Sequence, residues 1–125
     1  MKHNVVYLGN IVQVAEYLYM SESFELQSVV TYKLAITEEM KYFSLLRDIK
    51  VAGLESYSEL ENELKDVPAD SVILISGFGL IIRSSILEKF KVFNIHFGEL
   101  PDYKGRHPSF FATLNNEKEL GVSLH

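Results

Sequence analysis

The sequence contains no cysteine, which excludes disulfide bonds and thiolate zinc sites. It also lacks an apolar run near the roughly 20 residues that a membrane-spanning helix needs, and the apolar stretch behind its N-terminus is too short for a signal peptide. Its 12 lysines and arginines are scattered and the net charge is −5, so no basic face is available for nucleic-acid phosphates. We therefore expect a cytoplasmic protein that binds neither DNA nor a membrane.

What the sequence does contain is the composition of a single globular domain. Hydrophobic residues make up 47% of its 125 residues and charged residues make up 23%, which is the balance of a folded chain with one core. No internal repeat, low-complexity stretch or linker divides it. We therefore predict that residues 1–125 belong to one domain.

Strand-like and helix-like segments alternate along the chain. Short apolar or β-branched runs predict strands, and segments with apolar residues on one helical face predict helices. The expected strands cover residues 5–9, 26–34, 50–54, 71–76, 92–96 and 121–125, and the expected helices cover 11–20, 37–49, 56–64, 84–90 and 107–115. This alternation predicts an α/β, Rossmann-like fold with a mostly parallel sheet and helices on both faces.

Ligands of such sheets bind beyond the carboxyl ends of the strands, so the turns after Gly9, Ser76 and His96 are expected to share one rim. Asn94 and His96 lie two residues apart at the last of these strand ends, and residues i and i+2 of a strand point to the same face. An amide N–H and an imidazole N–H aimed at one point suit an oxygen that gains negative charge, and histidine also transfers protons near neutral pH. The alternative is that Asn94 satisfies loop backbone while His96 caps the strand, and the pair alone leaves both interpretations open.

A series of short motifs accompanies this pair in a fixed order. They read NIH at 94–96, LPDYKG at 100–105, NNEK at 115–118 and GVSLH at 121–125. In order and spacing they resemble the N-terminal domain of the folate-dependent formyltransferases. The runs VVYLGN at 5–10 and SVILISGFGLII at 71–82 resemble the first strand and the folate-pocket strand of the same family.

The resemblance implies transfer of a formyl group from 10-formyltetrahydrofolate to a primary amine, with no metal. It implies that Asn94 and His96 are the catalytic residues, which stabilise an oxyanion while His96 moves protons. The residues that match the family's folate pocket are Phe78, Gly79, Leu80 and Ile82. The competing interpretation of this stretch is that residues 80–82 simply cover the core.

The resemblance also implies an acceptor site, for which Gly9, Asn10 and Phe97 are the candidates. The motif GRHP at 105–108 is most similar to the sugar-nucleotide branch, so the expected acceptor is an amino sugar nucleotide. Methionyl-tRNA and glycinamide ribonucleotide are the alternatives, and the acidic net charge disfavours the tRNA. Phe97 opens a Phe-Gly-Glu sequence where the family has Pro-Ser-Leu, and Lys104 replaces a common arginine, which keeps the charge but loses its bidentate fork.

The family's third catalytic residue is an aspartate a few residues beyond the histidine that His125 matches. The sequence ends before that place, so we expect an incomplete domain with little transferase activity of its own. The alternatives of a different class are a non-catalytic α/β module, such as a scaffold that forms a homodimer, and a generic nucleotide-binding domain.

Overall fold

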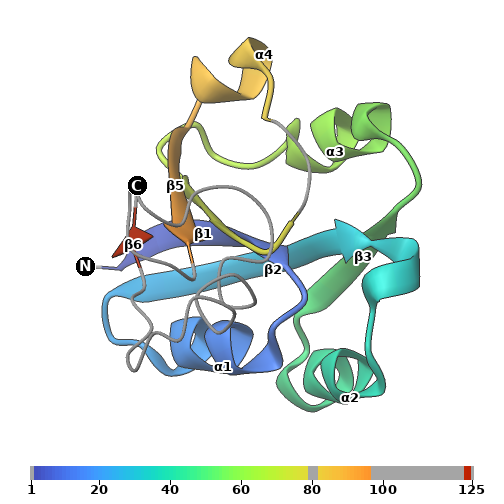
Figure 1. Cartoon of the computed structure of the whole chain (residues 1–125). Helices are drawn as coiled ribbons and strands as arrows, with labels where there is room; N and C mark the ends of the chain where they lie inside the picture. The colour runs from blue at the N-terminus through green and yellow to red at the C-terminus, as the bar shows by residue number, and fades with distance from the viewer. Residues whose placement is uncertain (1, 79–81, 97–122, 125) are drawn as a thin grey trace, which may run out of the picture.

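The computed structural model describes residues 2–78, 82–96 and 123–124 of the chain, which form an α/β fold around one sheet (Figure 1). Its elements in chain order are β1 (His3–Gly9), α1 (Val12–Met20), β2 (Phe24–Tyr32), the 3-10 turn η1 (Lys33–Ala35), α2 (Glu38–Arg47), β3 (Lys50–Leu54), α3 (Tyr57–Leu64), β4 (Val72–Ser76), α4 (Ser84–Leu87), β5 (Lys91–His96) and β6 (Ser123–Leu124).

The sheet has the strand order β3-β2-β1-β4-β5-β6. The pairs among β1 to β5 are all parallel, and β6 runs antiparallel to β5 at the edge. The chain first builds outward from β1 to β3 and then returns to place β4 on the other side of β1. The order therefore reverses between β1 and β4, which is the position where open α/β sheets bind ligands.

Helices cover both faces of the sheet, which confirms the predicted Rossmann-like arrangement. Figure 1 shows α1 and α2 below the sheet and α3 and α4 above it. The alternation of side chains along β1 supplies both cores, because Val5 and Tyr7 pack with α1 and α2 while Val6 and Leu8 pack with α3 and α4. All four side chains are fully buried, which makes β1 the centre of the domain.

Local chemistry explains where α2 begins and ends. The Thr37 hydroxyl accepts a hydrogen bond from the Met40 N–H at 3.1 Å and caps the N-terminus, and two glutamates occupy the first turn, where the helix dipole favours them. At the other end Asp48 adopts a left-handed conformation with φ of 54° and stops the helix. The predicted helix 37–49 is therefore shortened by a residue at its start and by two at its end.

Other predicted boundaries also change. The strand expected at 26–34 begins two residues earlier, at Phe24, and ends at Tyr32, where the chain turns into η1. The helix expected at 84–90 is a single turn, Ser84–Leu87. The helix expected at 107–115 lies outside the described residues. Among the helices that the structure describes, none is long and apolar enough to cross a membrane.

The packing of α2 gives a direct test of the core. Phe43 is 1% exposed and Leu45, on the same helix, is 84% exposed. We expect Phe43→Ala to lower the free energy of unfolding by about 3–5 kcal/mol, because it removes buried surface and leaves a cavity. Leu45→Ala is the matched control and should change it by less than about 0.5 kcal/mol. Urea denaturation of both variants measures the difference, and equal losses would contradict this assignment of the helix faces.

Candidate functional site

The carboxyl ends of three neighbouring strands form the candidate site. Gly9 at the end of β1 is in register with Ser76 at the end of β4, and Ser76 is in register with Ile95 near the end of β5. The turns after Gly9 and Ser76 and the end of β5 therefore share one rim, at the point where the strand order reverses. This is the arrangement expected from the alternation of strands and helices.

Asn94 lies on the α3 and α4 side of β5. Two residues before it, Val92 packs against the core beneath those helices, and strand alternation puts Asn94 on the same face. Its side chain is half-buried rather than sealed in the core. The backbone of β5 runs on to His96, but the side chain of His96 lies outside what the structure describes.

The turn after β4 carries the predicted folate-pocket residues. The Phe78 ring is buried in the core beneath α3 and α4 and stacks on Tyr32, with ring centroids 5.5 Å apart and an interplanar angle of 16°. Ile82 is half-buried against the same core. Gly79 and Leu80 lie outside the described residues. Phe78 and Ile82 thus contribute to the core, and their predicted contact with folate stays a prediction.

Gly77 is a residue of this turn that the sequence pattern did not single out. Its φ is +62°, and a Cβ added there would meet no atom within 4 Å. Glycine is needed at this position for its backbone conformation, and open space lies beside it. The sequence signal that could have identified Gly77 was its position directly after a buried strand, because a glycine there is typical of a turn with positive φ.

The turn after β1 is held by internal hydrogen bonds. The hydroxyl of Tyr7 accepts a hydrogen bond from the N–H of Ile11 at 3.2 Å, and the amide of Asn10 donates one to the Ala35 carbonyl at 3.3 Å. A Cβ on Gly9 would lie 2.5 Å from the Tyr7 hydroxyl oxygen and closer still to the Ser76 carbonyl oxygen. Gly9 and Asn10 thus have structural roles of their own in addition to the predicted acceptor role.

Tyr7 is a second residue that the sequence pattern did not identify, because its hydroxyl cannot be told from core packing in an apolar run. Burial raises the pKa of Tyr7, while the nearby Ser76 side chain and the Ile11 N–H partly offset this increase. The Ser76 hydroxyl is itself buried and does not reach hydrogen-bond geometry with any described residue. A buried polar pair, Tyr7 and Ser76, therefore lies directly beneath the rim.

A metal site is not apparent in the described part of the chain. No three histidine, aspartate or glutamate side chains gather there in a way that could hold an ion. The chemistry available at the described rim is that of hydrogen-bond donors and acceptors, namely the amide of Asn94 and the backbone of the two glycine turns.

Comparison with known proteins adds sequence and structural relatives. The model of a family described as formyl transferase matches residues 28–125. A methionyl-tRNA formyltransferase of Ureaplasma parvum is 31% identical over 137 aligned positions, which cover 99% of this chain and 45% of that protein. The chain thus spans less than half the length of this curated relative.

Two solved structures share the fold. A phosphoribosylglycinamide formyltransferase from Bacillus halodurans is 20% identical with a TM-score of 0.79, over 99% of this chain and 71% of that one. A formyltetrahydrofolate deformylase from Pseudomonas syringae is 16% identical with a TM-score of 0.79, over 100% of this chain and 46% of that one. At these identities the similarity establishes the shared fold.

The contact at Gly9 predicts coupled effects of substitution. We expect Gly9→Ala to lower the free energy of unfolding by about 1–3 kcal/mol, because the new methyl group overlaps Tyr7 and Ser76. Tyr7→Phe alone should cost about 1 kcal/mol through the lost hydrogen bond to Ile11. The double variant should lose less free energy of unfolding than the two single variants lose together, because Tyr7→Phe removes the hydroxyl oxygen that the new methyl group would overlap. Urea denaturation of the wild type, the two single variants and the double variant gives the free energies of unfolding for this double-mutant cycle.

Gly77→Ala provides the control for this double-mutant cycle. We expect it to lower the free energy of unfolding because alanine disfavours the positive φ at this position, and not because its methyl group overlaps Tyr7. Its effect should add to that of Tyr7→Phe with little coupling. Strict additivity in the Gly9 cycle would contradict the contact between the added methyl group and the Tyr7 hydroxyl.

The raised pKa of Tyr7 predicts a dependence of stability on pH. The folded state holds the phenol proton of Tyr7 more tightly than the unfolded chain does, where the pKa of Tyr7 is near the ordinary 10.0. The protonated Tyr7 therefore contributes fully to the free energy of unfolding below that pH. This contribution is lost as the pH rises above it. Unfolding by urea from about pH 8 to about pH 11 should show a steeper decline in the wild type than in Tyr7→Phe. Parallel declines would show that Tyr7 does not titrate differently in the folded state.

Proposed function

The chain belongs to the formyl transferase family, and from this premise we propose that its rim transfers a formyl group from 10-formyltetrahydrofolate to a primary amine. The observation that carries the proposal is the place of Asn94. It lies near the end of β5, in the rim beside the end of β4 and one strand away from β1, and within the matched residues 28–125. The motif at 94–96, which resembles the motif of this family, therefore occupies the edge where α/β sheets bind ligands.

The proposed chemistry assigns one task to each of two side chains. The bound donor supplies a formyl carbon that an amine nitrogen can attack. The Asn94 amide would donate a hydrogen bond to the formyl oxygen as that oxygen gains negative charge. His96 would accept the proton that the attacking amine nitrogen releases, and in its protonated form it would donate a second hydrogen bond to that oxygen. It would then pass the proton to the donor nitrogen as the bond between that nitrogen and the formyl carbon breaks, so that tetrahydrofolate leaves and the amine carries the formyl group.

The donor is proposed to lie along the turn after β4, at Phe78, Gly79, Leu80 and Ile82. Two observations on the described part of this turn fit such a group. No atom of the described residues would lie within 4 Å of a Cβ on Gly77, and the buried Phe78 ring provides a fixed apolar support at the same turn. Because the Phe78 ring is covered, its support of the donor would come through the backbone and through packing rather than through an exposed aromatic face.

The acceptor amine is proposed to lie between the turn after β1 and the end of β5, where Gly9, Asn10 and Phe97 are the candidate contacts. We propose the amine of methionyl-tRNA, because the sequence relative from Ureaplasma parvum carries that activity in its name. The amino sugar nucleotide favoured by the GRHP motif gains no support from that relative or from the two solved structures. The net charge of −5 disfavours broad contact with tRNA phosphates, so the chain would hold the aminoacyl end rather than the body of a tRNA.

The catalytic assignment predicts a large loss of rate. In formyl-transfer assays with 10-formyltetrahydrofolate, Asn94→Ala and His96→Ala should each lower the turnover of methionyl-tRNA by about 10²–10³-fold, because each removes one donor to the developing oxyanion. The acceptor is tested in the same assay by replacing methionyl-tRNA with glycinamide ribonucleotide or with an amino sugar nucleotide.

Lys91→Ala is the matched control, since Lys91 is an exposed residue at the other end of the same strand. It should leave turnover unchanged. If both rim variants kept full activity, Asn94 and His96 would have no part in the reaction. The isolated chain is expected to have little activity, so these assays use a longer protein that contains it. A lack of transfer by that protein to any of the three acceptors would favour a non-catalytic module.

A further inference from the structure

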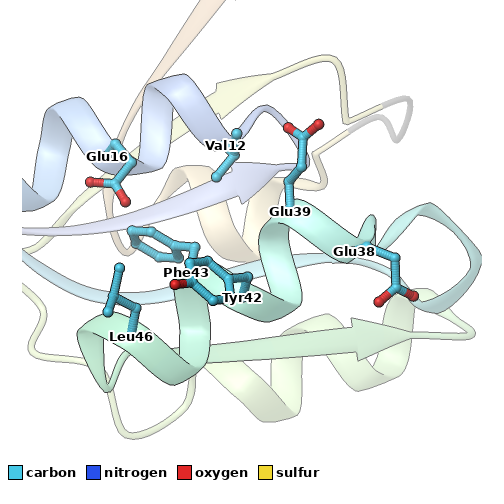
Figure 2. A pocket seen from close by; sticks show the side chains of 7 residues that line it. All are labelled: Val12, Glu16, Glu38, Glu39, Tyr42, Phe43 and Leu46. Carbon is cyan, nitrogen blue, oxygen red and sulfur yellow. The ribbon is translucent and has the colours of Figure 1, made fainter.

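A groove runs between α1 and α2, on the face of the sheet opposite to α3 and α4. It has a volume of about 490 Å³, and Figure 2 shows that Glu16 of α1 and Phe43 of α2 point toward each other across it. Its lining consists of Val12, Glu16, Glu38, Glu39, Tyr42, Phe43 and Leu46. Among the described residues, the lining thus combines four apolar or aromatic side chains with three carboxylates and includes no lysine or arginine.

The apolar part of the groove continues onto exposed surface. Leu46 and Tyr42 line it and are mostly exposed, and Leu45 is exposed beside them on α2. Of the nine large hydrophobic side chains that are exposed among the described residues, six lie on these two helices. They are Tyr17, Tyr19 and Met20 on α1 and Tyr42, Leu45 and Leu46 on α2. Single exposed apolar residues are ordinary, but Tyr42 and Leu46 lie together in the groove with Leu45 next to them on α2, and such a cluster is typical of an interaction surface.

The charges of the groove are not balanced. Glu16 pairs with Arg47 at 3.1 Å and Glu38 pairs with Lys41 at 3.1 Å. Glu39 is exposed and has no ion-pair partner among the residues that the structure describes. The groove therefore presents a net negative edge next to an apolar floor.

We propose that the α1–α2 groove binds a basic amphipathic helix of a partner protein. A groove between two helices accepts the apolar stripe of a third helix, with anchors spaced at i, i+3 or i+4, and i+7. The 10 residues of α2 extend about 15 Å, which matches three turns of such a helix. Lysine and arginine side chains flanking the stripe would lay their apolar stems over Tyr42 and place their charged ends near Glu39.

The same charges argue against a second copy of this chain as the occupant. A symmetric contact would bring the same patch of both copies together and oppose the glutamates of one groove to those of the other. Like charges placed against each other across an interface are unfavourable, whereas a cationic partner is both attracted and oriented by them. The groove also lies on the face of the sheet away from Asn94, so occupation leaves that residue uncovered.

The proposal is tested with the full chain and a synthetic helix. The probe is a fluorescent peptide with leucine at i, i+3, i+4 and i+7 and lysine elsewhere, and its control has glutamate in place of every lysine. Fluorescence anisotropy should show saturable binding of the lysine peptide, none of the glutamate peptide, and weaker binding as salt is raised. Glu39→Lys and Leu46→Ser should each weaken binding by about tenfold or more.

Two matched variants on α4 keep this result specific. Glu88→Lys makes the same change of net charge as Glu39→Lys, and Leu87→Ser removes a leucine that is 52% exposed, comparable with 58% for Leu46. Both should bind the lysine peptide as the wild type does, and circular dichroism verifies that all four variants are folded.

Equal losses in the α4 variants, or no saturable binding at all, would overturn the proposal. It would equally be overturned if sedimentation showed a dimer of the chain that Leu46→Ser dissociates, because the groove would then be an interface between copies. A peptide affinity that depends on Glu39 and Leu46 but not on Glu88 and Leu87 supports it.

Discussion

The structure depends on the burial of β1 between two parallel neighbours and two layers of helices. Val5, Val6, Tyr7 and Leu8 are all fully buried, and they alternate between the two cores. A strand covered on both faces has no side that tolerates a polar group without a partner. Tyr7 is the one polar side chain among the four, and its hydroxyl finds a partner by accepting a hydrogen bond from the Ile11 N–H. This hydrogen bond also holds the turn that follows β1 at the rim.

That constraint connects packing to function. The turn after β1 has to pass directly over the Tyr7 hydroxyl and beside the Ser76 carbonyl, and only glycine at position 9 leaves room for both. Asn10 then joins this turn to the end of η1 through the Ala35 carbonyl. Two loops at the carboxyl edge are thus held in place before any ligand binds. Preformed loops of this kind are what a site needs if it is to hold two reactants in a fixed geometry.

Much of the fold could be predicted from the sequence because its signals are local. The run 71–76 is apolar between its two terminal serines, and the structure places β4 between β1 and β5 with both faces covered. The boundaries were less accurate where tertiary contacts decide them. The predicted helix at 84–90 is reduced to one turn, and Phe90, expected within it, packs into the core just before β5. Nothing in the sequence near residue 90 indicates that burying the Phe90 ring is favoured over continuing the helix.

The candidate site was predictable to a similar extent. Glycine after a buried strand and the spacing of Asn94 and His96 identified the rim, because parallel strands bring their carboxyl ends together. The role of the Tyr7 hydroxyl was not predictable, since it depends on a hydrogen bond that only the turn geometry creates. The stacking of Phe78 on Tyr32 was not predictable either, because Tyr32 ends β2 and Phe78 follows β4, and only the folded sheet brings the two together.

The rim and the α1–α2 groove are connected through the starts of α1 and α2. Val12 lies in the first turn of α1, Glu38 and Glu39 lie in the first turn of α2, and all three line the groove. The loops that precede these helices are the ones joined by the hydrogen bond from Asn10 to Ala35. A partner in the groove would therefore rest against helices whose origins border the proposed acceptor turn. Because a close-packed interior transmits strain, we expect a displacement at the start of α2 to reach the turn after β1 through this hydrogen bond.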